Sequence, residues 1–385
     1  PEDMLESRAT APALRAPELR EALACDAHAA DEAARVIARA QRPLLIIGED
    51  IRWSFDTAAL RELVDNCGVP FITSPMGRGY MPDDHALCAN EIRRTIQGRA
   101  DVVVMAGAWF DWRFRFGTEL APEAVVIHAD SDPATLGKNV PNAVTILSEP
   151  GEFLNRLAPA LRREIGHVGA SRFSSWHESL AALIAESRGA QQQWRLAESS
   201  PLQPQQLYTA LRDVIPSDAI VAVEGNICLA AAQKVLRARQ PASWIDPGRN
   251  GIIGGSIPFA LGAKLASPER PVFALCSDTG FGMSAMDLEA AVRHRIAIVV
   301  VIANNEGNGG SVRQRNFFPG GHDERFCEFL PGLRYERIVE IFGGHAEHIT
   351  DAAEIRGAVE RALASGVVSC LNVTVDPQAP HSGIW

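Results

Sequence analysis

The stretch from Cys276 to Gly310 constrains the fold of this chain more than any other. It combines an acidic turn at Asp278, an amphipathic segment over 283–295, an uncharged β-branched run over 296–303 and the asparagine pair 304–305. The spacing of apolar residues predicts a helix, and the β-branched run predicts a strand buried on both faces. Because crossovers between parallel strands are right-handed, both carboxyl ends reach one edge of the sheet. The stretch therefore predicts a parallel α/β unit.

Polar side chains follow both strands of this unit. Asp278 comes just after the apolar run 272–276, and Asn305 follows the run 296–303. Ligands of open α/β sheets bind outside the carboxyl ends of the strands, so we expect Asp278 and Asn305 to meet there. One carboxylate, one amide oxygen and one backbone carbonyl suit Mg²⁺ completed by phosphate and water oxygens. The alternative is an ordinary turn in which Asp278 caps the helix.

Alternating strands and helices along the chain predict an α/β protein with two doubly wound parallel-sheet domains. We expect the first domain over 1–165, a polar helical connector over 166–200, a second domain over 201–377 and a tail over 378–385. A helix is predicted over 26–40. The apolar runs that predict the strands of the first domain are 44–47, 69–72, 102–105 and 125–128.

Composition excludes several classes of function. A net charge of −10 argues against nucleic-acid binding, which depends on basic surface. The seven cysteines show no CxxC spacing, which favours reduced thiols over a zinc site or a disulfide framework. No apolar stretch approaches the ~20 residues that span a bilayer, and acidic residues occupy the beginning of the chain, where a signal peptide would be basic. We expect a cytoplasmic protein that binds neither nucleic acid nor membrane.

The turn around Asp278 resembles the thiamine-diphosphate binding motif, whose usual form is Gly-Asp-Gly followed by Asn-Asn. Here Ser277 and Thr279 replace the two glycines, and Asn305 follows Asp278 by 305 − 278 = 27 positions, a spacing that suits the family. The resemblance implies that Asp278, the side chain of Asn305 and the carbonyl of Gly307 hold Mg²⁺ on the diphosphate of thiamine diphosphate. Ser277 and Thr279 would contact the cofactor from the same turn.

Other segments are similar to 2-hydroxyacyl-CoA lyases and oxalyl-CoA decarboxylases. They are the segments 43–85, 100–117, 136–140, 224–230 and 248–266. By this resemblance Gly225 and Asn226 donate to phosphate oxygens. Gly251 lies in a glycine-rich turn that allows close backbone approach, and Ile253 is the apolar wedge that bends the cofactor. Buried core is the alternative for Ile253, and a plain turn is the alternative for Gly225 and Asn226.

The resemblance also touches a nucleotide site in the first, central domain. Asp130 follows the strand over 125–129, where an aspartate contacts an adenine nucleotide in related enzymes that handle CoA. Glu49 stands where a lysine is usual, and Trp109 stands where an arginine is usual. Losing two cations would weaken binding of CoA or ADP phosphates. A turn residue that caps the next helix is the alternative for Asp130.

Family members carry three domains: an aminopyrimidine-binding domain, a central domain and a diphosphate-binding domain. Residues 1–5 resemble the segment that closes the first of these, and the catalytic glutamate of the family lies in that domain. A separate subunit could supply it, the chain could be a fragment of a longer product, or catalysis could be lost. We expect a separate small subunit in a heterotetramer or a higher assembly.

The resemblance implies the large subunit of a split, thiamine-diphosphate-dependent carbon–carbon lyase, decarboxylase or carboligase of the 2-hydroxyacyl-CoA lyase type. Its substrate would be a small carbonyl compound or an acyl-CoA. Acetolactate-synthase-like carboligation of 2-oxo acids is one alternative, and a catalytically silent binding or regulatory subunit is another. Arg313 and His322, in the loop after Gly307, and Ser382, in the tail, are candidates for contacts with substrate.

Overall fold

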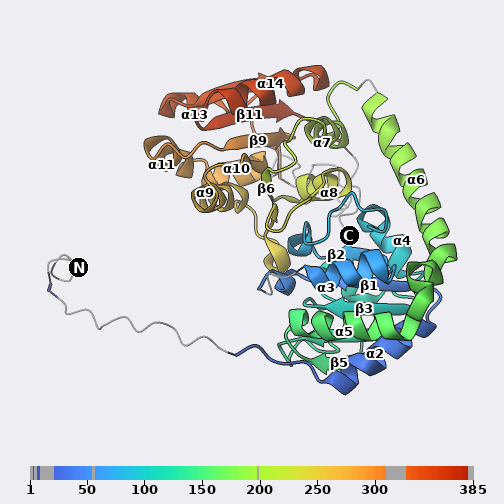
Figure 1. Cartoon of the computed structure of the whole chain (residues 1–385). Helices are drawn as coiled ribbons and strands as arrows, with labels where there is room; N and C mark the ends of the chain where they lie inside the picture. The colour runs from blue at the N-terminus through green and yellow to red at the C-terminus, as the bar shows by residue number, and fades with distance from the viewer. Residues whose placement is uncertain are drawn as a thin grey trace, which may run out of the picture.

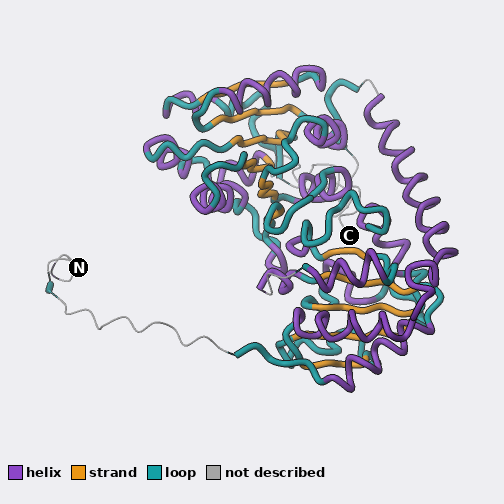
Figure 2. The backbone as a smooth tube through the Cα atoms, viewed as in Figure 1, coloured by secondary structure: helices purple, strands orange, loops and turns teal. Residues whose placement is uncertain are grey.

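The computed structural model describes residues 3, 7–8, 21–53, 57–196, 199–308 and 327–379 of the 385 residues in the chain. These residues form two α/β units connected by the long helix α6 (Ser174–Leu196), which runs along one side of the molecule (Figure 1). In each unit the strands form a central layer between helices (Figure 2). The two doubly wound parallel-sheet domains predicted from the sequence are confirmed.

The central unit contains a five-stranded, fully parallel sheet in the order β2-β1-β3-β4-β5. Its strands are β1 (Pro43–Ile47), β2 (Phe71–Thr73), β3 (Val102–Ala106), β4 (Val125–Asp130) and β5 (Val144–Leu147). Its helices are α2 (Ala27–Arg39), α3 (Ala58–Arg61) with the π-helical turn Glu62–Asn66, α4 (Arg93–Gln97) and α5 (Pro150–Ile165). Every residue of β1 and β3 is buried, as expected for central strands of a parallel sheet.

The second unit contains a six-stranded parallel sheet in the order β10-β11-β9-β8-β6-β7. Its strands are β6 (Ile220–Val223), β7 (Trp244–Ile245), β8 (Val272–Ser277), β9 (Val299–Asn304), β10 (His345–Ile349) and β11 (Ser369–Thr374). Its helices are α7 (Pro204–Arg212), α8 (Asn226–Val235), α9 (Ser256–Ala266), α10 (Asp278–Ser284), α11 (Asp287–Arg293), α13 (Arg337–Phe342) and α14 (Ala352–Ala364). Separate apolar clusters cover the two faces of this sheet.

The connector α6 contacts both units. The indole N–H of Trp176 donates to the carbonyl of Pro43 at 3.1 Å in the central unit. Near the other end of the helix, the amide of Gln191 donates to Glu91 at 3.1 Å and to the carbonyl of Lys234 at 3.5 Å. The helix therefore packs against both units. Within the described ranges, no helix is long and apolar enough to cross a bilayer.

The helix predicted over 283–295 is wrong in its bounds and in its apolar face. Two helices, α10 and α11, occupy this region, and Met286 between them is 69% exposed. The first helix begins earlier because Ser277 caps it, with its Oγ accepting from the N–H of Gly280 at 3.1 Å. The second helix ends at Arg293, and Arg295 has a φ of +55°, which a helix cannot continue. The strand predicted from 296 begins only at Val299.

Candidate cofactor site

The turns after β8 and β9 meet at Asp278, which is 1% exposed. Its Oδ1 accepts from the N–H of Thr279 at 2.7 Å, and its Oδ2 accepts from the N–H of Gly307 at 3.0 Å. Asn304 shapes the second turn, because its Oδ1 accepts from the N–H of Glu306 at 3.1 Å. The structure thus brings Asp278 to the turn that carries Asn305 and Gly307. The helix cap is Ser277, not Asp278 as the alternative for this turn supposed.

The carboxyl group of Asp278 lies in an environment that suits a cation. Burial raises its pKa to about 6, while the N–H groups of Thr279, Gly307 and Glu306 partly offset this rise. Among the described residues, no Lys or Arg forms an ion pair with Asp278. The described part of the chain also holds no group of three or more His, Cys, Asp or Glu side chains arranged to hold a metal ion. A metal here would rely on one carboxylate with amide and carbonyl oxygens, which is the donor set predicted for Mg²⁺.

Glu224 at the end of β6 links two parts of the site. Its side chain is fully buried, and its Oε2 accepts from the N–H of Gly254 at 3.0 Å. A Cβ at Gly280 would overlap Oε1 of Glu224, so a larger residue there would displace the carboxyl group. The sequence showed Glu224 only as a neighbour of Gly225 and gave Gly280 no role. Their approach joins segments far apart in sequence, which no local pattern reveals.

The next turn of the chain begins α8. Gly225 has a φ of +86°, a conformation that favours glycine, and Asn226 is the first residue of the helix. Oδ1 of Asn226 and Oε1 of Glu224 are buried and have no hydrogen-bond partner among the described residues. Buried polar atoms are normally satisfied, so such atoms beside these turns fit a site that a ligand completes.

The Glu224 environment gives a pH-dependent prediction. Burial raises the pKa of Glu224 from 4.5 to about 7, so the folded chain binds this proton more tightly than the unfolded chain. The contribution of this group to the free energy of unfolding therefore falls as pH rises from about 5 to about 8. Over this range, the free energy of unfolding of wild type, measured in urea, should fall by up to about 3 kcal/mol relative to that of Glu224→Gln. The exposed Glu289→Gln serves as control, and parallel pH profiles for wild type and Glu224→Gln would refute the assignment.

The glycine-rich segment before α9 presents Ile253. Gly251 and Gly254 have φ values of +59° and +87°, and a Cβ at Gly254 would lie 2.8 Å from Cβ of Met283. Ile252 and Ile253 are 49% and 40% exposed. Ile253 is therefore not a core residue, which was the alternative to a wedge. Its place on a turn anchored to Glu224 is compatible with contact to a ligand.

Taken together, the residues at this edge fit a diphosphate with a divalent cation. Among the described residues, the turns that follow β6, β8 and β9 carry a buried carboxylate without a cationic partner and two buried oxygens without a hydrogen-bond partner. The glycine turn before α9 admits close approach beside them. The predicted contacts Arg313, His322 and Ser382 lie outside the described residues.

The surroundings of Asp130 fit a nucleotide poorly. Burial, with a smaller contribution from the nearby Asp50, raises the pKa of Asp130 to about 6, and Oδ1 accepts from the N–H of Asp132 at 2.9 Å. Glu49 pairs with Arg113 through contacts of 2.7 and 3.1 Å. The crevice thus offers acidic groups to a phosphate. Asp130 stabilises a turn, but it caps no helix, because turn residues follow it and the next helix, α5, begins only at Pro150.

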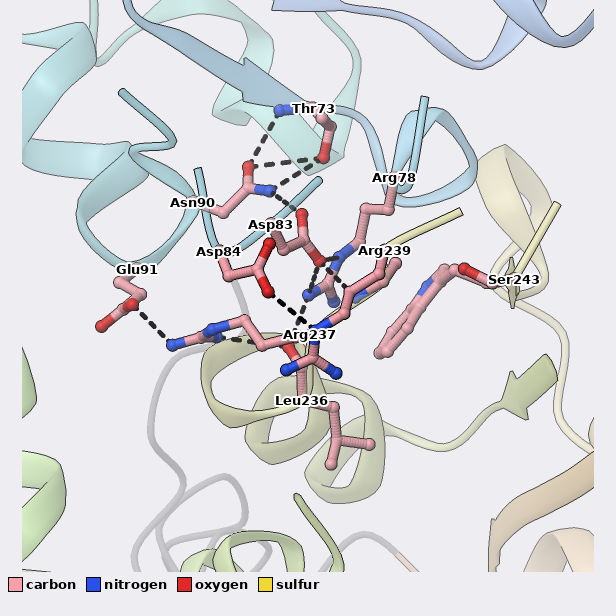
Figure 3. Close-up of polar contacts among 12 residues, drawn as sticks. Thr73, Arg78, Asp83, Asp84, Asn90, Glu91, Leu236, Arg237, Arg239 and Ser243 are labelled. Carbon is pink, nitrogen blue, oxygen red and sulfur yellow. Dashed lines mark hydrogen bonds and ion pairs between the residues drawn. The ribbon is translucent and has the colours of Figure 1, made fainter. Parts of the chain in front are cut away.

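A polar cluster joins the two units at the far end of α8 (Figure 3). Arg78 donates from Nε to Asp83 at 2.8 Å and from Nη2 to the carbonyl of Leu236 at 2.7 Å. The same carboxylate accepts from the N–H of Ala238 at 2.8 Å, and the guanidinium of Arg78 lies 4.0 Å from the ring centroid of Trp244. These contacts fix the position of α8 against the central unit.

A cavity of about 340 Å³ lies beside this cluster. Donor groups dominate its lining, and the acid Glu91 is already paired with Arg188 and Arg237. Nη1 of Arg78 and Nε2 of Gln233 are buried without a hydrogen-bond partner among the described residues. The polar and charged lining residues are Thr73, Arg78, Asn90, Glu91, Arg93, Arg94, Thr95, Gln233 and Lys234.

Comparisons with known proteins identify the two units. A family model of the thiamine pyrophosphate enzyme central domain matches residues 30–157, and one of the C-terminal TPP binding domain matches residues 224–373. The chain is 32% identical to the acetolactate synthase large subunit of Mycobacterium tuberculosis, over 92% of this chain and 63% of that protein. It is 29% identical to the 2-hydroxyacyl-CoA lyase of Arabidopsis thaliana, over 91% of this chain and 62% of that protein.

The similarity to oxalyl-CoA decarboxylase from Escherichia coli is 26% identity, over 89% of this chain and 60% of that protein. The chain therefore spans about three fifths of the length of these relatives. The matches confirm the resemblance drawn from the motifs, on both sheets and in the same order along the chain. This chain belongs to the thiamine pyrophosphate enzyme family, of which it carries the central domain and the C-terminal cofactor-binding domain.

Proposed function

We propose that this chain is the large, cofactor-binding part of a carbon–carbon lyase, decarboxylase or carboligase that depends on Mg²⁺ and thiamine diphosphate. The observation that supports it best is the buried carboxylate of Asp278, joined to Gly307 at 3.0 Å within a domain of this family. Relatives with lyase, decarboxylase and synthase names cover more than four fifths of the chain.

Each residue at the sheet edge has a role in this proposal. Asp278, Asn305 and the carbonyl of Gly307 hold the metal. The N–H groups and side chains of the turns around them hold the diphosphate, and Ile253 supports the bent form of the cofactor. Thiamine diphosphate supplies an electron sink for breaking or making a bond next to a carbonyl. The turn residues that complete the diphosphate contacts are Gly225, Asn226, Ser277 and Thr279.

The proposal assigns the catalytic glutamate to an aminopyrimidine domain on a separate subunit, in a heterotetramer or a higher assembly. Apolar side chains gather beside the cofactor site, where Ile252, Ile253, Met283 and Met286 are between 40% and 69% exposed. Exposed apolar groups around a site mark a surface that another domain covers. An aminopyrimidine domain elsewhere on a longer polypeptide would use the same surface. All seven cysteines are buried thiols, which supports a cytoplasmic location.

The cavity beside Arg78 supports a substrate that carries negative charge, such as an acyl-CoA. Its buried donors, Nη1 of Arg78 and Nε2 of Gln233, have no acceptor within the described ranges, and burial lowers the pKa of Lys234 in the same wall. A phosphate or carboxylate would satisfy these donors. The acetolactate synthase relative, at 32% identity, supports carboligation of 2-oxo acids as the second candidate.

Product analysis tests the proposal. The chain, supplied with an aminopyrimidine-domain subunit, Mg²⁺ and thiamine diphosphate, is offered 2-hydroxyacyl-CoA thioesters, 2-oxo acids and aldehydes in separate reactions. Cleavage of the thioester supports the lyase, and joining of two 2-oxo acids supports the synthase-like candidate. A chain that binds no cofactor even with the partner present would instead be a silent binding or regulatory subunit.

A further inference from the structure

The segment that carries Ile253 is held at its downstream end by its own unit. The N–H of Gly254 donates to Oε2 of Glu224 at 3.0 Å, and the carbonyl of Gly254 accepts from Oγ of Ser284. Ile252 and Ile253, just upstream, are 49% and 40% exposed. Little packing within the cofactor-binding unit therefore fixes their direction.

The upstream end is held by the central unit. The indole N–H of Trp112 donates to the carbonyl of Arg249 at 2.9 Å. The side chain of Arg249 forms an ion pair with Glu49 at 3.4 Å. A Cβ at Gly251 would lie 3.4 Å from the ring of Trp112, so this turn rests against the indole. Two side chains of one unit thus hold a segment of the other, only a few residues before Ile253.

These two side chains are themselves held firmly. Glu49 is 4% exposed and receives both terminal nitrogens of Arg113, at 2.7 and 3.1 Å. Arg113, next to Trp112 in the chain, also donates to Asp111 at 2.8 Å. Glu49 of this cluster faces the cofactor-binding unit, where it pairs with Arg249 at 3.4 Å. A fixed anchor of this kind can set the position of a glycine-rich segment.

We propose that Trp112 and Glu49 are positioning residues for Ile253. By holding Arg249 they fix the segment 249–254, and with it the surface against which the organic part of the cofactor bends. The diphosphate is held elsewhere, at Asp278 and the turn of Gly307. The clamp should therefore affect binding of thiamine diphosphate and not binding of diphosphate alone. This inference rests on the proposed function.

The first test is hydrogen exchange of the full chain without cofactor. Trp112→Phe removes the N–H donor and keeps a ring against Gly251. We expect amides of 249–254 to exchange about fivefold faster, with no change at 277–281. Trp109→Phe is the matched control, because Nε1 of Trp109 has no hydrogen-bond partner among the described residues. Unchanged exchange at 249–254 in Trp112→Phe would overturn the clamp.

The second test compares two ligands, inorganic diphosphate and thiamine diphosphate, each with Mg²⁺ and with the aminopyrimidine-domain subunit present. Trp112→Phe and Ile253→Ala should each lower the affinity for thiamine diphosphate by about fivefold and leave the affinity for diphosphate unchanged. Because both act through the same segment, the affinity of the double variant should fall by less than the product of the two single effects. Equal weakening of both ligands would overturn a role through Ile253. If wild type binds neither ligand, the proposed function is wrong. If wild type binds both ligands and Trp112→Phe changes neither affinity, only the inference about Trp112 is wrong.

Discussion

Asp278→Asn is expected to weaken Mg²⁺-dependent binding of thiamine diphosphate by at least about 100-fold, because losing even an indirect contact to a metal costs 10- to 100-fold. The substitution keeps the shape of the side chain and removes its charge. Asp278 is 1% exposed, and no Lys or Arg among the described residues forms an ion pair with it. An amide cannot replace the single carboxylate of the proposed cage. Calorimetric titration of the cofactor with Mg²⁺, and again with a chelator, measures the effect.

Asp287→Asn is the matched control, since Asp287 is an exposed aspartate on the next helix of the same unit. It should bind cofactor as wild type does. The amide of Asp278→Asn can keep only one of the two contacts with the N–H groups of Thr279 and Gly307. Cooperative unfolding of this variant must therefore be shown, to exclude loss of binding through misfolding. A folded Asp278→Asn that binds the cofactor with unchanged affinity and metal dependence would show that the site lies elsewhere.

Arg113→Met is expected to lower the free energy of unfolding by about 3 to 5 kcal/mol, the usual cost of breaking a buried ion pair from one side. The side chain of Arg113 is fully buried between Glu49 and Asp111. Those carboxylates raise the pKa of Arg113, so it is always charged. Without the guanidinium, the buried carboxylates of Glu49 and Asp111 lose their shared partner, and Glu49 keeps only its weaker ion pair with the more exposed Arg249, at 3.4 Å, among the described residues.

Urea unfolding of Arg113→Met and Arg115→Met separates burial from loss of charge. Arg115 is 47% exposed and pairs with Glu119 at 3.0 Å, so its loss should cost less than about 1 kcal/mol. Both variants remove one positive charge within three positions of sequence. Equal losses of stability in the two variants would contradict the view that the buried cluster supports the central unit.

The fold and the core of the site could be predicted because their signals are local. Uninterrupted apolar runs indicated buried parallel strands, and the polar residues that follow them, Asp278 and Asn305, indicated a shared edge. The paired position of Asp278 and the turn of Gly307 in the structure follows from that topology. The extent of the helix between them did not follow, because capping by Ser277 outweighed apolar spacing.

Contacts between distant segments could not be predicted. Glu224 contacts Gly254 across 30 positions of sequence, and Trp112 contacts Arg249 across 137 positions. Resemblance flagged Glu49 as an acid in place of a lysine but gave it no partner. The structure supplies Arg113 and Arg249 as its partners, which explains how a buried acid is tolerated there.

Native mass spectrometry of the protein purified from its own source, with Mg²⁺ and thiamine diphosphate present, shows whether a separate subunit completes the enzyme. We expect this 41.6 kDa chain together with a second chain of about one domain, ~150–200 residues, and bound cofactor. Denaturing spectra of the same sample would give the two masses separately. A lone 41.6 kDa species that carries no cofactor, or one longer polypeptide that contains both parts, would contradict it.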